Sequence, residues 1–420
     1  MKKPNLKASA GIYTLQWTDS HLVMRFDRLK EDSHYNVSAE VLVRTNLPGY
    51  NPHLHHARLN LTSTQSKNSL AKHLKEEYDI PDVRWPEAIE QACVMVLEKY
   101  REGEPVIRIA DYQPPEQALY RIERLLFEKQ PNLIFGPGGS LKSFLAVYLA
   151  IMVDEPMPAH GWAVEAGTVL YLDYETSQDD FTYRVRALRR GLDLSPNNHH
   201  ILYRYCWQPL AAEAAEIQRI IMDKEIDLLI IDSAGIACGG SPEEAAATIA
   251  YFTALRATRI TTLTIAHTAK SGGGDKGPFG SVYWMNFPRT VFEIVSVQEP
   301  GEANVAIALA HRKTNMGRRM KPIGLKFDFV ETEEHRLESV SVAPANVLAL
   351  PDLARLASIK DQITSELQRG AKTALELAET LLLKPDSVRK ALQRGQSLWC
   401  EQLPNDKWGL SLLQRDMLRT

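Results

Sequence analysis

Cysteine is scarce in this 420-residue sequence, and long apolar runs are missing. The cysteines form no C-x-x-C pair, which argues against a disulfide framework or a zinc knuckle and fits a reducing cytoplasm. They are Cys93, Cys206, Cys238 and Cys400. No apolar run is long enough to span a bilayer, and polar residues follow Met1-Lys-Lys where a signal peptide would be apolar. The sequence therefore predicts a cytoplasmic protein without a membrane partner.

An excess of charge of one sign is missing too. The chain has 49 Lys and Arg residues against 52 Asp and Glu residues, which gives a net charge of −3. A protein with this balance is not a polycation, so any contact with nucleic acid has to come from local basic patches. Hydrophobic residues make up 44% of the sequence, a usual share for a globular protein, and the length allows two or three domains.

The sequence does contain a glycine-rich stretch between two apolar runs. Leu133-Ile-Phe135 leads into it and the run from Phe144 to Met152 leads out, which indicates a buried strand, a tight loop and a buried helix. The stretch fits G-x-x-x-x-G-K-[ST], except that a leucine stands where the last glycine is expected. The residues predicted to bind nucleotide phosphates are Gly136, Pro137, Gly138, Gly139, Ser140, Leu141, Lys142 and Ser143.

The chemistry predicted for this loop is the binding of ATP with Mg²⁺. Glycines let the backbone approach a polyanion, and the helix N-terminus offers it unpaired N–H groups. Lys142 would reach the β- and γ-phosphates, and the hydroxyl of Ser143 would hold Mg²⁺. The alternative is an ordinary glycine-rich turn between a strand and a helix.

Strand and helix patterns alternate from residue 131 to about 340. This alternation predicts an α/β fold with a mostly parallel sheet covered by helices on both faces. The predicted strands are 132–135, 168–174, 227–232, 262–267, 290–294, 305–310 and 323–329. The predicted helices are 142–152, 179–190, 212–224 and 242–258. The last three strands lack intervening helices, so the sheet is expected to finish antiparallel.

Polar residues stand at the ends of several predicted strands, where ligands of such sheets bind. Asp232 ends the strand 227–232 and would orient Mg²⁺. The next residue is Ser233 and not a glutamate, so the base that activates water is sought elsewhere. Glu175 is the first candidate and Asp173 the second. Both could instead cap the helix that follows.

His267 ends the strand 262–267 and is followed by a glycine-rich basic loop. The imidazole could hydrogen-bond near the γ-phosphate and report its loss, or it could be an ordinary structural histidine. The loop carries Lys270 and Lys276 and ends near Phe279, a composition suited to contact with a single strand of nucleic acid. The alternative is a disordered surface loop.

The segment 311–321 has five Arg or Lys residues and no acidic residue, and it joins two late strands. Arg312 and Lys313 are predicted to act as fingers on the γ-phosphate of a neighbouring subunit. Arg318 and Arg319 are predicted to contact the backbone of DNA. A solvated basic turn is the alternative.

The flanking segments predict two smaller domains. Residues 1–112 have an α+β pattern, with strands at 11–17, 22–26, 39–44 and 105–109 and helices at 66–78 and 86–100. Their role is not indicated. The ATPase core is predicted to span 113–341, starting with a helix over 116–129, and 342–352 is predicted to be a linker.

Residues 353–420 resemble a winged helix. Helices are predicted at 353–369, 372–383 and 386–394, and a hairpin is predicted from 397–400 and 407–410. The third helix would be the recognition helix and would offer Arg389, Lys390 and Arg394 to DNA. A winged helix that docks on protein is the alternative.

The core resembles the RecA-like ATPase superfamily, and within it the RepA-type and DnaB-type hexameric helicases and related ATPases of phages and plasmids. The features that carry the resemblance are Gly136–Ser143, Tyr171–Glu175, Leu229–Asp232, Ile265–His267 before a glycine-rich loop, and Gly280-Ser281 leading to Arg289. The resemblance implies that Glu175 is the catalytic carboxylate, that the loop 271–280 faces a channel holding DNA, and that Arg312 and Lys313 act in trans. Leu141 departs from the pattern.

The expected protein is therefore an ATP- and Mg²⁺-dependent motor that forms a homo-oligomeric ring, a hexamer by the resemblance. Its expected role is that of a replicative-type DNA helicase of a mobile element, working with replication partner proteins. The alternatives are an ATP-dependent loader or remodeller of DNA complexes and an ATP-gated regulator that binds DNA without unwinding it.

Overall fold

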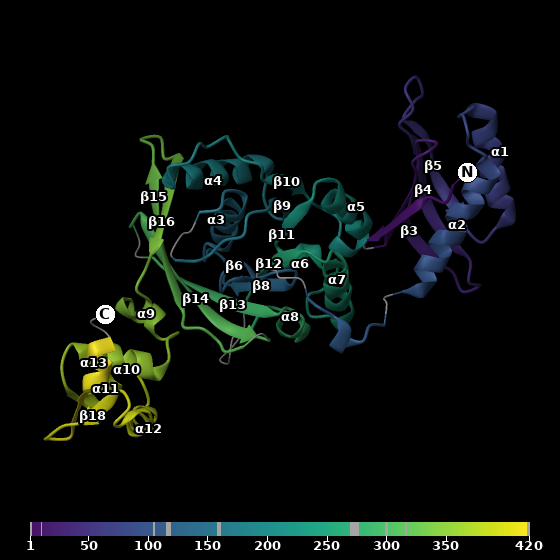
Figure 1. Ribbon diagram of the computed structural model, residues 1–420. Coiled ribbons are helices and arrows are strands. Elements are labelled where there is room, and N and C mark those ends of the chain that lie inside the picture. Colours follow the sequence, from purple (N-terminus) through teal and green to yellow (C-terminus); the bar gives the residue numbers. More distant parts are fainter. Residues whose placement is uncertain are drawn as a thin grey trace. The chain divides into compact units, whose positions relative to one another are not determined.

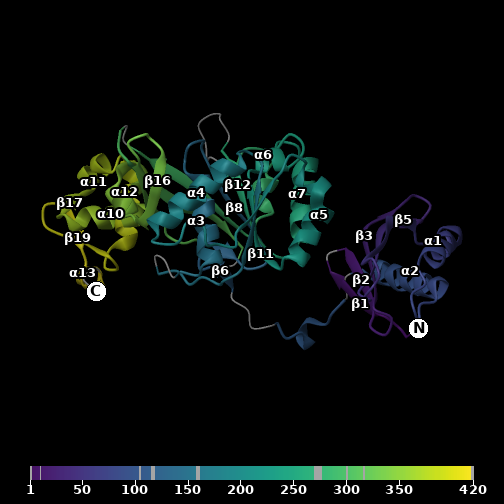
Figure 2. The same ribbon diagram turned by 90° about the horizontal axis from the view of Figure 1, so that it is seen from above.

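The computed structural model describes residues 2–9, 11–103, 106–114, 119–157, 161–268, 277–298, 301–315 and 317–417 (Figures 1 and 2). The chain forms two compact units. The first consists of Met1–Gln117, Ala212–Glu225 and Ala257–Arg259, and the second of Ala118–Ala211, Ile226–Arg256 and Ile260–Thr420. Among the described residues, none of the helices combines the length and the apolar character that a membrane crossing requires.

The first unit contains a five-stranded antiparallel sheet in sequence order, packed against two helices. The strands are β1 (Asn5–Ser9), β2 (Ile12–Trp17), β3 (Leu22–Glu31), β4 (Val37–Thr45) and β5 (His53–Asn60), and the helices are α1 (Thr64–Glu77) and α2 (Trp85–Glu102). Alternate residues of β2 to β4 are buried against the helices, which is the pattern that allowed their prediction. The predicted strand 105–109 is wrong, because residues 106–108 have no regular structure and Ile109–Asp111 form a 3₁₀ helix.

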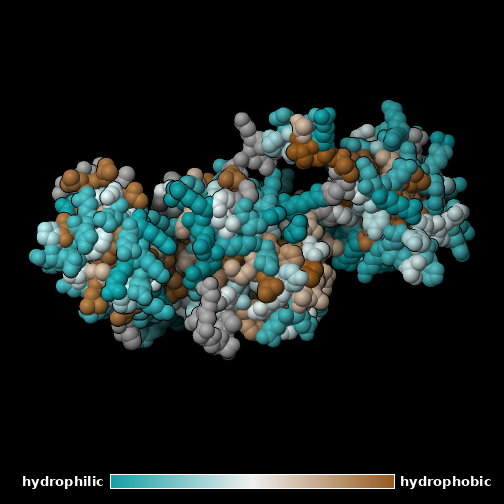
Figure 3. Space-filling view, turned by 90° about the horizontal axis from the view of Figure 1, so that it is seen from below, coloured by the Kyte–Doolittle hydropathy of each residue, from teal (hydrophilic) through white to brown (hydrophobic). Residues whose placement is uncertain are grey.

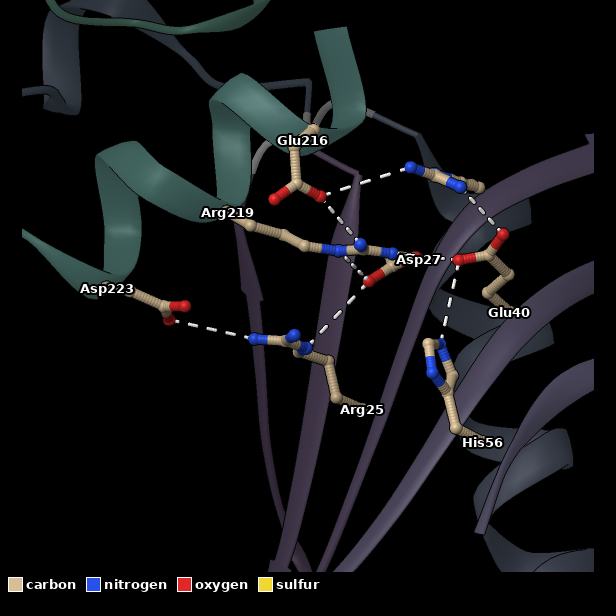
Figure 4. Close-up of polar contacts among 8 residues, drawn as sticks. Arg25, Asp27, Glu40, His56, Glu216, Arg219 and Asp223 are labelled. Atoms are coloured by element: carbon tan, nitrogen blue, oxygen red, sulfur yellow. Dashed lines mark hydrogen bonds and ion pairs between the residues drawn. The ribbon is translucent and has the colours of Figure 1, made fainter. Parts of the chain in front are cut away.

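Charged side chains join the sheet of this first unit to α5 (Leu210–Asp223), most of which belongs to the same unit (Figure 4). Arg219 donates to both carboxylate oxygens of Asp27, over 2.7 Å and 2.5 Å, and to Glu40 over 3.0 Å. Asp27 is only 3% exposed, so it needs this partner. At the edges of the cluster, Arg25 pairs with Asp223 over 3.6 Å.

The second unit is built on a nine-stranded sheet in the order β10-β9-β11-β12-β8-β13-β14-β15-β16. Neighbouring strands are parallel from β10 to β13 and antiparallel from β13 to β16, as predicted. The strands are β8 (Pro131–Gly136), β9 (Thr168–Asp173), β10 (Leu202–Tyr205), β11 (Ile226–Asp232), β12 (Thr261–His267), β13 (Thr290–Val297), β14 (Asn304–Thr314), β15 (Ile323–Glu331) and β16 (Leu337–Pro344). The sequence did not indicate β10, and β16 extends into the predicted linker 342–352.

Helices cover the sheet on both faces, with α3 and α4 on one side and α7 on the other (Figure 2). These helices are α3 (Lys142–Asp154), α4 (Gln178–Gly191) and α7 (Ala245–Ala257), and the short helices α6 (Ala234–Ala237) and α8 (Tyr283–Asn286) accompany them. Residues 145–153 of α3 are all buried, because the helix is apolar on every side and packs against four strands as well as α4. The core of the sheet therefore lies directly behind the glycine-rich loop.

A β-hairpin replaces most of the predicted helix 116–129, which is wrong over the described residues 119–129. β6 (Tyr120–Ile122) pairs with β7 (Leu126–Phe127). Leu125, Leu126 and Phe127 are buried in succession, a pattern that one face of a helix cannot provide. Arg121 is also buried and donates to both carboxylate oxygens of Glu128.

The C-terminal part of the second unit contains several short helices and a three-stranded sheet in the order β17-β19-β18. The elements are η2 (Val347–Ala349), α9 (Pro351–Ala354), α10 (Ile359–Gln368), β17 (Lys372–Thr373), α11 (Ala374–Thr380), α12 (Pro385–Gly395), β18 (Cys400–Gln402), β19 (Lys407–Leu410) and α13 (Leu412–Met417). The predicted helix 353–369 is wrong as one helix. It is interrupted before Ser358, whose hydroxyl caps α10 by accepting from the N–H of Asp361 over 3.1 Å. The predicted cap at Thr373 is present as a capping box with Glu376.

Candidate nucleotide site

The glycine-rich loop leaves β8 at Gly136 and enters α3 at Lys142. A Cβ on Gly136 would lie 2.4 Å from Cγ2 and 2.6 Å from the carbonyl oxygen of Ile294 on β13, so only glycine fits there. Gly139 has a φ of +74°, in the left-handed region that favours glycine. A Cβ on Gly138 would have no neighbour within 4 Å, so the loop is open on that side.

Leu141 takes the backbone conformation that a glycine would take at this position of the motif. Its φ is 60° and its ψ is 21°, which is left-handed and costs a leucine about 1–2 kcal/mol. The side chain packs, partly buried, against the main core, and this burial offsets the backbone cost. The loop therefore accommodates a leucine at this position of the motif.

Lys142 is held inside the loop by the loop's own backbone. Its Nζ donates to the carbonyl oxygen of Pro137 over 2.6 Å and lies 3.5 Å from Oγ of Ser140, which also donates to that carbonyl. The side chain is buried, and desolvation lowers its pKa, while the charges of Asp232 and Glu175 act to raise it. The ammonium group is thus poised for an anion in the loop.

Asp232 is a buried carboxylate with one unused oxygen. Its Oδ2 accepts a 2.6 Å hydrogen bond from the hydroxyl of Tyr171, and its Oδ1 has no partner among the described residues. Burial raises the pKa of Asp232, and hydrogen bonds from Tyr171 and Ser143 act against that rise. An unpaired buried oxygen beside a serine hydroxyl fits a hard divalent cation, so Ser143 and Asp232 could hold Mg²⁺ as predicted.

Glu175 lies just beyond β9 and meets the ends of the next two parallel strands. Its Oε1 accepts a hydrogen bond from the hydroxyl of Ser233, which follows β11, and lies 3.2 Å from Nε2 of His267, which ends β12. The pKa of Glu175 is lowered, chiefly by the hydrogen bond with His267, although partial burial acts to raise it. The carboxylate is therefore ionised and fixed at one oxygen. His267, predicted as a phosphate sensor, contacts Glu175 in this structure.

Asp173, the second candidate base, has its carboxylate committed to the turn after β9. It accepts from the N–H groups of Glu175 and Thr176, both over 2.9 Å, and from the hydroxyl of Thr176 over 2.5 Å. The hydroxyl of Tyr203 adds a contact at 3.3 Å. The idea that Asp173 and Glu175 cap the following helix is wrong, because Ser177 caps α4.

Two of the predicted basic residues are bound to their own chain. Arg312 donates through Nε, over 2.7 Å, and through Nη2 to the same oxygen of Glu293. Nζ of Lys313 donates to the carbonyl oxygens of Asn286 and Pro288 over 2.6 Å and 2.7 Å. Both residues lie within β14, close to its end at Thr314, where the connection to β15 begins.

The other predicted nucleic-acid contacts lie on exposed surfaces or outside the described residues. Arg318 and Arg319 are exposed in the connection from β14 to β15. On α12, cationic residues face solvent while Val388 and Leu392 are buried. The exposed cations of this helix are Arg389, Lys390 and Arg394. Lys270 and Lys276 lie outside the described residues.

Sequence reasoning missed two residues of this site. Tyr171, which donates to Asp232, carries the signal of a polar-tipped side chain in the middle of an apolar strand. From the sequence, Ser233 is significant only because it stands where a glutamate could follow Asp232. Its contact with Glu175 depends on how β9 and β11 are aligned.

Residues 101–273 match the sequence model of a protein family described as AAA domain. The match includes the glycine-rich loop together with Glu175, Asp232 and His267. The match, the parallel sheet and the loop geometry together support a P-loop ATPase domain in this part of the chain.

A crystal structure of a KaiC-like protein from the hyperthermophilic archaeon Pyrococcus horikoshii OT3 is similar over 52% of this chain and 94% of that chain. The two share 15% sequence identity, and the TM-score is 0.36. None of the curated proteins matches the chain.

Proposed function

We propose that this protein is an ATP-hydrolysing motor that acts on DNA, with a ring-shaped replicative-type helicase as its preferred form. The observation that carries the proposal is the meeting of Lys142, Asp232 and Glu175 at one edge of the parallel sheet. Their charges are close enough to shift one another's pKa. A phosphate-binding cation, a metal-binding carboxylate and a second carboxylate that can accept a proton from water are the groups that phosphoryl transfer to water requires.

Each of these residues has a separate task in hydrolysis. The loop N–H groups and Lys142 hold the phosphates and offset the charge that develops on them. Ser143 and Asp232 would hold Mg²⁺, which would neutralise phosphate charge. Glu175 orients the attacking water and takes its proton. This task needs an ionised carboxylate, and the hydrogen bond with His267 lowers the pKa of Glu175, which favours the ionised form.

The DNA part of the proposal is supported by exposed cations on two surfaces. One surface consists of Arg318 and Arg319, and the other is the basic side of α12. Exposed arginines and lysines bind phosphate backbones without reading sequence. A homo-oligomeric ring, hexameric by the resemblance, would place nucleotide between subunits. Arg312 and Lys313 could then serve a neighbour only by leaving the acceptors that they have in the single chain.

The first test is strand displacement on a forked DNA duplex, measured with ATP and Mg²⁺ and compared with DNA-stimulated ATP hydrolysis. We expect displacement that requires ATP and is lost in Glu175→Gln. An Arg318→Ala/Arg319→Ala variant is expected to lose DNA stimulation while it keeps its basal hydrolysis. Hydrolysis that DNA stimulates without any displacement would reject the helicase and leave a loader or remodeller.

The loader or remodeller is the second candidate, and the surface of the C-terminal part favours it. Hydrophobic patches interrupt the hydrophilic surface there, at the left of Figure 3. The exposed leucines of this part are Leu375, Leu382, Leu398, Leu412 and Leu413. Exposed apolar groups of this kind suit contact with a protein partner better than contact with DNA. A pull-down of a defined replication protein, lost in Leu412→Ser/Leu413→Ser, would support this role.

A further inference from the structure

Ser233 has no structural task that accounts for its hydroxyl. It precedes α6, yet its side chain makes no capping hydrogen bond to that helix. The residue is 1% exposed, and its hydroxyl donates to Oε1 of Glu175. A hydrogen bond from a buried hydroxyl to a charged carboxylate is strong and directional.

We propose that Ser233 is the positioning residue for Glu175, an inference that rests on the proposed hydrolysis of ATP. The Ser233 hydroxyl fixes Oε1, and the other oxygen of the carboxylate, Oε2, then faces the attacking water and accepts its proton. Among the described residues, Ser233 and His267 make hydrogen bonds with the carboxylate, and both of these end on Oε1. The carboxylate is thereby divided into one oxygen that is held and one that reacts.

The need for such positioning follows from the side chain of Glu175. It has three rotatable bonds, and 34% of its surface is exposed. A carboxylate with this freedom would spend most of its time out of line with the phosphate, and small misplacements of a catalytic group cost large factors in rate. Because water attacks phosphate through a loose transition state, orientation of the water matters more than the strength of the base.

Ser233 is better suited to this task than the second partner of Glu175. The side chain of His267 is 44% exposed, and its Nε2 lies 3.2 Å from Oε1. Ser233 is fixed by its buried place directly after β11. Asp232, the last residue of β11, faces Tyr171, and Ser233, the next residue, faces Glu175. One short piece of backbone therefore aligns the metal ligand and the base together.

The test compares Ser233→Ala in two backgrounds, the parent protein and Glu175→Gln, by steady-state ATP hydrolysis and by binding of a fluorescent ATP analogue. In the parent we expect kcat to fall by about 10- to 100-fold, with KM and analogue affinity within about threefold. In Glu175→Gln we expect no further loss, because Ser233 acts only through that carboxylate. Ser341→Ala, an exposed serine on β16, is the matched control and should match the parent.

Two results would overturn the inference. A Ser233→Ala variant with unchanged kcat would show that Glu175 needs no such partner. An equal further loss in the Glu175→Gln background, or a parallel loss of analogue affinity, would show that Ser233 serves the structure instead. The proposed function fails separately, if Glu175→Gln itself hydrolyses ATP at the parental rate.

Discussion

The phosphate loop and the base of the β14–β15 hairpin both carry cations, but these cations differ in how many hydrogen bonds they make within the chain. Lys142 has one short hydrogen bond, to a loop carbonyl, and the nearby Asp232 leaves a buried oxygen without a partner among the described residues. Arg312 and Lys313 each make two hydrogen bonds to their own chain. A ligand can supply the missing hydrogen bonds of buried groups that lack partners. An ion that is already paired must first be separated from its partner, which costs free energy.

Lys142→Ala gives the largest effect expected from this contrast. The rate of ATP hydrolysis should fall by about 1000-fold, because the loop loses the cation that offsets charge on the phosphates. The melting temperature of the nucleotide-free protein should change little, since removing a desolvated ammonium relieves a cost. The control is Lys326→Ala, whose exposed side chain pairs with Asp328 on β15. If Lys142→Ala failed to fold, Lys142 would be needed for stability, and the expected difference between the loop and the hairpin would be contradicted.

Arg312→Ala tests the other side of the comparison. It should lower the free energy of unfolding by about 3 kcal/mol in urea, because Glu293, which is 6% exposed, loses its partner inside the sheet. Arg319→Ala is the control, an exposed arginine of the same segment, and should leave stability unchanged. If Arg312→Ala keeps its stability and instead abolishes hydrolysis only when mixed subunits assemble, Arg312 is a finger and the comparison fails.

Asp232→Asn should separate function from stability at the phosphate site. Hydrolysis that depends on Mg²⁺ should be lost, while the nucleotide-free protein should melt on the order of 2 °C higher, because a buried charge has been removed. The pKa of Asp232 is raised by burial, so ionising this group costs stability as the pH rises through that pKa. The gain from the substitution should therefore be constant above that pKa and should shrink as the pH falls through it. An equal gain at every pH would contradict this cause.

Leu141→Gly should have the smallest effect. The leucine already takes the left-handed conformation that glycine favours, so the loop path and the rate of hydrolysis should stay within about threefold. Relief of backbone cost and loss of side-chain packing should nearly cancel, which leaves stability within about 1 kcal/mol. Leu141→Ala keeps the backbone cost and loses the packing, so it should be less stable than Leu141→Gly. If Leu141→Ala melted at a higher temperature than Leu141→Gly, the left-handed conformation would not carry the expected cost in free energy.

The sequence predicted those parts of the fold whose signal lies in consecutive residues. The apolar runs around the glycine-rich loop marked β8 and α3, because both elements are buried almost completely. By contrast, β5 buries only Leu54 and Leu59, and β10 buries none of its residues, so neither has a strong alternating pattern. The sequence of the hairpin 120–127 predicts a helix because Ile122, Leu125 and Leu126 have helical spacing, although the next residue, Phe127, does not fit one helix face.

The parts of the site that sequence could not give depend on alignment between strands. Glu175 and Ser233 meet because β9 and β11 are paired with Asp173 opposite Asp232. Arg312 meets Glu293 because β13 and β14 pair with a bulge at that point. Residues far apart in sequence gave no signal of either pairing, although Glu175 and Ser233 were visible as polar residues just beyond strand ends.

The central claim is that Glu175, and not the neighbouring carboxylate Asp173, activates the water that hydrolyses ATP. The most direct measurement is the rate of ATP hydrolysis by Glu175→Gln and Asp173→Asn, with binding of an ATP analogue measured for each. We predict that Glu175→Gln falls by at least about 100-fold while it keeps its affinity for the analogue. Asp173→Asn should keep most of its rate and lose thermal stability instead, because its carboxylate holds the turn after β9. Hydrolysis at the parental rate by Glu175→Gln, or its selective loss in Asp173→Asn, would contradict the account.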